Sequence, residues 1–109
     1  MKRLRDKKAI QKIYHNGKRR SSGDLTLLYL ENKSLQCNYA VHVAKRFGIA
    51  VKRNRIKRVF RELLLRFRER LIGYDIVIRP KRKAGELNFN KLFQRLERMF
   101  IEAEIPNQK

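Results

Sequence analysis

Residues 45–62 combine dense positive charge with the apolar residues that a folded helix needs. This stretch holds eight Lys or Arg residues and no acid before Glu62. At about 100° per residue, the apolar positions of a helix from about residue 50 to 71 share one arc: Ile56, Phe60, Leu63, Leu64, Phe67 and Leu71. A disordered basic tail lacks such a stripe, because ordering a segment requires buried apolar surface to offset lost entropy. The stretch is therefore predicted to fold, with Gly73 closing the helix.

The cations of this predicted helix lie beside its apolar arc and crowd its first turn. Lys52, Arg53 and Arg55 stand where the helix dipole favours acids, which destabilises the isolated helix. A local rule broken in this way points to a functional site, and here to an anionic partner. The alternative is a solvated charged surface, which is what most runs of charge are.

The charge of the whole chain also indicates a polyanionic partner. The 109 residues include 29 Lys or Arg against 10 Asp or Glu, giving a formal charge of +19, which is costly through self-repulsion. Nucleic acid and an anionic membrane both satisfy this inference. No apolar run approaches the roughly 18 residues of a membrane span, and the charged N-terminus does not resemble a secretory signal. We expect one cytoplasmic domain, spanning residues 1–109.

The side chains do not suggest a protein active site or a metal centre. The ten acids are dispersed, and two histidines and one cysteine show no zinc-ligand spacing. Glu62 is interpreted as half of a helix-surface ion pair with Arg58 or Arg66, and Cys37 as a small buried hydrophobe. His42 is interpreted as a satisfied or solvated histidine more readily than a catalytic one.

Flanking patterns predict the remaining elements. A short helix follows Asp6 and ends at Asn16-Gly17, a basic loop follows at 18–23, and strands are predicted at 24–31, 36–44 and 74–79. A second basic loop at 81–83 precedes a last helix capped by Asn88 or Asn90. Its apolar face is Phe89, Leu92, Phe93, Leu96, Met99, Phe100 and Ala103. This order predicts an α+β fold or α/β sandwich, with the two longer helices packed on one sheet.

Two segments carry a resemblance to a known family. Val-Ala-Lys-Arg-Phe-Gly at 43–48 and Ala-Val-Lys-Arg-Asn-Arg-Ile-Lys-Arg-Val-Phe-Arg-Glu at 50–62 closely resemble the Arg-Asn-Arg signature of the bacterial ribonuclease P protein. The likeness extends from about Leu4 to Phe100. It implies the ribosomal protein S5 domain 2-like fold, with about four strands, three helices and a left-handed strand-helix-strand crossover. It also implies a short edge strand within 18–23, which the residues themselves do not indicate.

The resemblance implies a role in tRNA maturation. The chain is expected to be the protein subunit of an endonuclease whose catalyst is a separate RNA using Mg²⁺, and which removes the 5′ leader of precursor tRNA. The expected partners are therefore the catalytic RNA and precursor tRNA, with no membrane and no obligate protein partner. The RNA-binding positions that transfer are Lys45, Arg46, Lys52, Arg53, Asn54, Arg55, Lys57, Arg58 and Arg61.

The family also binds the single-stranded leader between its first helix and the exposed face of its sheet. The corresponding residues are Ile10, Tyr14, Thr26, Leu28, Asn38, Ala40 and His42. Tyr14 supplies a ring on which a base can stack, although an ordinary core aromatic is an equally good interpretation. Ile10 departs from the usual Phe and Ala44 from a frequent Ser, which puts one stacking contact and one hydroxyl contact in doubt.

Two other functions remain open at this point. A ribosomal or RNA-chaperone protein fits the charge equally well. The combination of the 43–62 signature with Ile10 and Tyr14 on the first helix is not expected of such a protein, and it distinguishes the two functions. A membrane-surface or general polyanion-binding module is the third class, and vesicle binding in competition with RNA distinguishes it.

Overall fold

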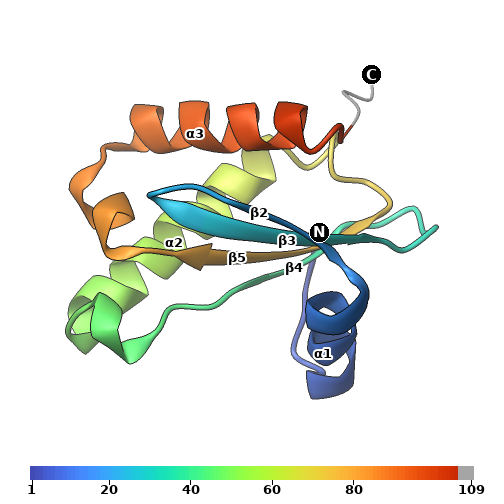
Figure 1. Ribbon diagram of the computed structural model, residues 1–109, viewed down its shortest axis with the longest axis horizontal. Coiled ribbons are helices and arrows are strands. Elements are labelled where there is room, and N and C mark those ends of the chain that lie inside the picture. The colour runs from blue at the N-terminus through green and yellow to red at the C-terminus, as the bar shows by residue number, and fades with distance from the viewer. Residues whose placement is uncertain (106–109) are drawn as a thin grey trace.

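The computed structural model describes residues 1–105 as a five-stranded mixed sheet with three α-helices (Figure 1). The strands are β1 (Lys2–Arg3), β2 (Lys18–Ser21), β3 (Leu25–Glu31), β4 (Asn38–Val41) and β5 (Tyr74–Pro80). The helices are α1 (Lys7–Asn16), α2 (Ala50–Arg66) and α3 (Phe89–Glu102), with short 3₁₀ helices η1 (Lys45–Phe47) and η2 (Arg82–Glu86).

The sheet has the strand order β1-β4-β5-β3-β2. β4 is parallel to both β1 and β5, whereas β3 is antiparallel to β5 and β2. The chain passes from β4 through α2 to β5, so the cationic helix connects two neighbouring parallel strands. The predicted α+β class is confirmed, with one strand more than the expected four.

The main core lies between the sheet and the two longer helices. Alternate residues of β3, Leu25, Leu27 and Tyr29, face this core. The predicted apolar arc of α2 and the predicted face of α3 both pack into it, so both periodicities are confirmed. Phe67 links the two helices, because its ring lies 4.6 Å from that of Phe93 between centroids.

The opposite face of the sheet carries α1 and a smaller apolar cluster. Ile13 packs on Leu28, Ala40 and Val77, one residue from each of the three central strands. Figure 1 shows α1 and α3 on opposite sides of the strands. The predicted cap of α1 is confirmed, since the Asp6 carboxylate accepts a hydrogen bond of 3.0 Å from the Lys8 amide.

Gly17 ends α1 where the chain passes close to its own backbone. A Cβ at this position would lie 2.4 Å from the Ile13 carbonyl oxygen and 2.9 Å from that of Tyr29. Backbone atoms cannot yield as a flexible side chain does, so we expect Gly17→Ala to lower the free energy of unfolding by at least about 1 kcal/mol. Urea denaturation measures this change. Gly23→Ala is the matched control, because nothing lies within 4 Å of its added Cβ; equal stability of the two variants would contradict the prediction.

Several predicted boundaries are wrong at the edges of elements. The basic loop at 18–23 contains β2, which confirms the short edge strand that the resemblance implies; all of its side chains are exposed, so no apolar alternation marks it. β1 was not predicted, and the strand at 36–44 is shorter than expected. The predicted basic loop at 81–83 runs into η2. α2 ends at Arg66 instead of 71; a series of turns follows and ends at Gly73, whose φ of 88° favours glycine.

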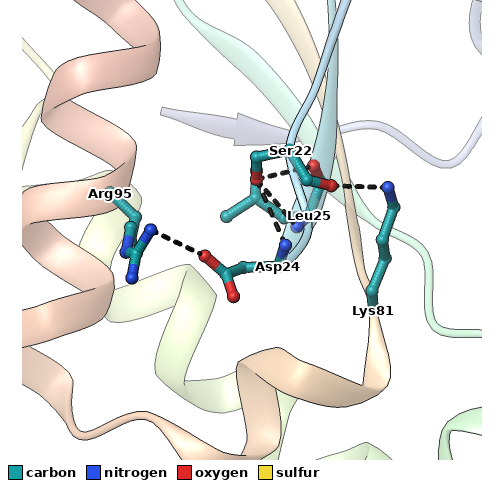
Figure 2. Close-up of polar contacts among 5 residues, drawn as sticks. All are labelled: Ser22, Asp24, Leu25, Lys81 and Arg95. Carbon is teal, nitrogen blue, oxygen red and sulfur yellow. Dashed lines mark hydrogen bonds and ion pairs between the residues drawn. The ribbon is translucent and has the colours of Figure 1, made fainter.

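The turn between β2 and β3 is fixed by polar contacts from two other elements (Figure 2). The Ser22 hydroxyl oxygen accepts hydrogen bonds from the amides of Asp24 and Leu25, at 3.2 and 3.3 Å. Arg95 of α3 forms a 3.3 Å ion pair with the buried Asp24, and the Lys81 ammonium donates to the Ser22 carbonyl. These contacts hold the turn between β2 and β3 against α3 and against Lys81, the residue that follows β5.

Cys37 is buried on the core side of the sheet, as predicted. Burial raises the pKa of its thiol to about 12, so the thiol remains protonated at neutral pH. It acts as a small apolar side chain.

Candidate RNA interface

The start of α2 presents positive charge without a compensating cap. Ile49 occupies the N-cap position and offers no side-chain hydrogen bond, and the first turn contains no acid. η1 packs against this end of the helix, with Phe47 buried and Lys45 and Arg46 exposed. The unpaired amides, the helix dipole and the cations therefore all favour an anion here.

The cations of α2 divide into two groups. Arg53, Lys57 and Arg61 recur every fourth residue and are half-buried along one flank of the helix. The cations Lys52, Arg55, Arg58 and Arg66 are exposed to solvent, as is Asn54. All nine predicted RNA-binding residues thus lie on η1 and α2, which the fold holds together.

Glu62 does not belong to this group. Its carboxylate forms an i,i+4 ion pair of 3.8 Å with Arg66, and both side chains are more than half exposed. This confirms its interpretation as a helix-surface pair.

Tyr14 and His42 meet between α1 and the end of β4. The Tyr14 hydroxyl and His42 Nδ1 are hydrogen-bonded at 3.2 Å, and their rings are near parallel, with centroids 6.2 Å apart. The Arg79 guanidinium lies 5.9 Å from the centre of the Tyr14 ring. Tyr14 is 37% exposed and is therefore not a core aromatic.

The other predicted cleft residues have different environments. Leu28 and Ala40 are buried beneath Ile13, so α1 itself covers that part of the sheet. Asn38 donates a 2.9 Å hydrogen bond to the Asp75 carboxylate, and Ile10 is half-buried on α1. The structure therefore does not place all seven residues along one open groove.

An open cavity of about 320 Å³ lies next to the Tyr14–His42 pair. His42 and the buried Thr26 line it, together with five cations: Arg19, Arg46, Arg79, Lys81 and Arg82. Of these, only Arg46 was predicted to contact RNA, and as part of the signature. Thr26 pairs with Arg79 across β3 and β5, so both side chains lie on the α1 side of the sheet. The cavity is thus strongly cationic.

His42 is expected to make stability depend on pH. Burial, with Arg79 and Lys57 nearby, lowers its pKa below the usual 6.5. Between these two values the unfolded chain binds more protons than the folded one, so the free energy of unfolding falls as pH is lowered through that window. We expect His42→Gln to reduce this fall, measured by urea denaturation at about pH 7.5 and 5.5. His15→Gln, at an exposed histidine, is the control; identical pH dependence in wild type and His42→Gln would contradict the assignment.

Among residues 1–105, no group of three or more His, Cys, Asp or Glu side chains could hold a metal ion. No helix in the same range is long and apolar enough to cross a membrane.

Comparison with known proteins identifies the family. The family model described as Ribonuclease P matches residues 1–104. The chain belongs to the ribonuclease P protein family. The ribonuclease P protein component of Streptococcus agalactiae is 33% identical over 94 residues, covering 86% of each chain. That of Staphylococcus epidermidis is 30% identical over 108 residues, covering 98% of this chain and 94% of the relative.

Solved structures agree with this assignment. The ribonuclease P protein of Thermotoga maritima superposes with a TM-score of 0.81 at 27% identity, covering 91% of this chain and 94% of that one. The Staphylococcus aureus protein gives a TM-score of 0.86 at 24% identity and supports the fold. The chain is thus a protein component of the ribonucleoprotein endonuclease that matures tRNA 5′ ends, and family membership implies association with ribonuclease P RNA.

Proposed function

We propose that η1 and α2 bind the catalytic RNA, and that the cleft around Tyr14 and His42 binds the 5′ leader of precursor tRNA. The observation that carries the first assignment is the start of α2, which lacks a side-chain cap and bears cations where acids are favoured. Lysines there neutralise phosphates, and the Arg-Asn-Arg residues add bidentate and donor-acceptor geometry.

The leader site is supported by an exposed aromatic ring beside a cationic cavity. Tyr14 offers a stacking surface for an unpaired base, which a phosphate-lined duplex does not supply. Thr26 and His42 belong to the cavity wall, with Ile10 beside Tyr14 on α1. Leu28 and Ala40 pack against Ile13 beneath α1. Asn38 lies near the start of that helix, at the end away from Tyr14.

We assign Mg²⁺ to the RNA. The described residues offer no cluster of acids that fits a magnesium site, so the protein contributes binding and positioning to a reaction that the RNA carries out.

The test is cleavage of precursor tRNA by a ribonuclease P RNA at low Mg²⁺, with and without the purified chain. Stimulation of the RNA, and no cleavage by the protein alone, are expected. A ribosomal or RNA-chaperone protein would bind RNA without stimulating cleavage, so absence of stimulation would reject the proposal. Magnesium-dependent cleavage that copurifies with RNA-free protein would reject the assignment of catalysis to the RNA.

We further propose that the β4–α2–β5 crossover is left-handed, as in ribosomal protein S5 domain 2-like folds, although such connections are rare. The sequence resemblance supports this, and an experimental structure tests it.

The same resemblance supports one RNA-binding domain acting in the cytoplasm without an obligate protein partner. Sedimentation of the protein with the RNA alone, as a single complex, is the corresponding measurement.

A further inference from the structure

A second cavity, of about 560 Å³, lies where the first half of α2 meets η2 and the start of α3. Its volume falls within the range of ligand pockets, about 300–1,000 Å³. The residues that line it come from η1, α2, η2 and α3: Phe47, Lys52, Arg55, Ile56, Val59, Arg82, Lys83, Ala84, Gly85, Glu86, Leu87, Phe89 and Leu92. Lys52 and Arg55 belong to the nine predicted RNA-binding residues, and Arg82 also lines the cavity beside His42.

The inner wall of this cavity is apolar and partly aromatic. Ile56 and Leu92 are buried, whereas Val59, Leu87 and Phe89 remain half-exposed. Small residues keep the space open on the η2 side, where a Cβ on Gly85 would come within 3.2 Å of the Phe47 ring. The Arg66 guanidinium lies 5.3 Å from the centre of the Phe89 ring, so the aromatic wall adjoins a further cation.

The rim is cationic. Lys52 and Arg55 approach from α2, and Arg82 and Lys83 from η2, and all four are exposed. Glu86 is the single acid among the described residues that line the cavity. A ligand that fits this site therefore has a flat apolar part for the wall and negative charge at its margins.

We propose that this cavity receives one unpaired nucleobase of the partner RNA, with the phosphates on either side of that nucleotide held by the rim cations. A base has the planar face that Phe47 and Phe89 accommodate, and its own backbone supplies the charge for Lys52, Arg55 and Arg82. An apolar protein segment would leave these cations without counter-charges. The inference rests on the proposed function, because it extends the RNA contact of α2 to η2 and α3.

Filling the cavity tests the proposal in the complete complex. Val59→Phe places a ring in the space, whereas Ile101→Phe places a ring at an exposed position of α3 outside it. Ribonuclease P RNA is probed with dimethyl sulfate and a carbodiimide, alone and with each protein. One unpaired base is expected to be protected by wild type and Ile101→Phe but not by Val59→Phe, whose affinity for the RNA falls about tenfold.

Protection and affinity that are the same for all three proteins would overturn the inference while leaving the proposed function intact. Failure of wild type to bind the RNA would overturn both. Melting temperatures establish that Val59→Phe is folded, since Val59 packs against the main core.

A second measurement needs no variant. Amide shifts of the labelled wild-type chain are recorded with adenosine 5′-monophosphate and, separately, with ribose 5-phosphate. Both are expected to move Lys52, Arg55 and Arg82, but only the nucleotide is expected to move the amides of Ala84, Gly85 and Leu87. Equal shifts with the two compounds would show a phosphate site alone, and would exclude base capture; unmoved cavity amides would leave an apolar protein segment as the occupant and reject RNA.

Discussion

Replacing Arg53, Arg55 and Arg58 together with Gln is expected to flatten the salt dependence of binding to ribonuclease P RNA. A protein that neutralises about six to ten phosphates loses roughly 10³–10⁵ in affinity between about 50 and 200 mM salt. Binding releases counterions from the RNA, and this release becomes less favourable as the salt concentration of the solution rises. Each lost contact reduces the logarithmic slope by about 0.7–0.9, so the triple variant is expected to lose about two to three units. Filter binding over a series of salt concentrations measures the slope.

The matched control removes three cations elsewhere. Lys33 lies in the turn before β4, and Lys91 and Arg98 are exposed on α3. Their joint replacement with Gln gives the same net charge as the α2 variant, so any general effect of charge is equal. If the control flattens the slope as much as the α2 variant, or if the α2 variant leaves it unchanged, the RNA binds another surface.

The sequence predicted the helical arc of α2 well because burial leaves a periodic record. Ile56, Phe60 and Leu63 repeat at helical spacing and all pack in the core. The same signal overestimated the end of the helix. Phe67 and Leu71 are also buried, but the backbone leaves the α-helix at Arg66 and reaches them through turns. Periodicity reports which side chains are buried, and a chain can bury them without continuing the helical hydrogen bonds.

The edge strands β1 and β2 could not be predicted from the periodicity of their own residues, for a related reason. β1 pairs with one neighbour through Lys2 and Arg3, and β2 exposes every side chain. Such strands have no buried face, so their sequences show no alternation. Their pairing is decided by the neighbouring strands and not by their own residues. β1 pairs with β4, which is distant in sequence, and β2 pairs with β3, which follows it directly.

The leader cleft shows what alternation along a strand can and cannot predict. It placed Asn38, Ala40 and His42 on one face, but the position of α1 decides which of them stays accessible. Arg79 could have been found, because it follows Asp75 and Val77 at every second residue of a predicted strand. Arg19 could not, since β2 itself was not evident and its side chain reaches the cavity only through pairing with β3.

Tyr14→Ala is expected to weaken binding of leader-bearing precursor tRNA by about 5-fold to 150-fold, and to leave binding of mature tRNA nearly unchanged. Stacking of one base on an aromatic ring contributes about 1–3 kcal/mol, and only the precursor has unpaired leader bases to stack. Asn54→Ala or Arg55→Ala is expected to act differently, impairing assembly with the catalytic RNA or raising its Mg²⁺ requirement. Affinities of the assembled complex for the two tRNAs, measured for each variant, separate these surfaces.

Tyr14→Phe distinguishes the ring from its hydroxyl. This variant keeps the stacking surface and the neighbouring Arg79 guanidinium but loses the 3.2 Å hydrogen bond to His42. If stacking carries the effect, Tyr14→Phe binds precursor nearly as well as wild type, and if the hydroxyl orients His42 for a phosphate, it weakens binding as Tyr14→Ala does. Because Tyr14 is 37% exposed, neither variant is expected to lower the melting temperature much. A lowered melting temperature, with parallel weakening toward precursor and mature tRNA, would remove Tyr14 from the leader site and make it a structural support for α1.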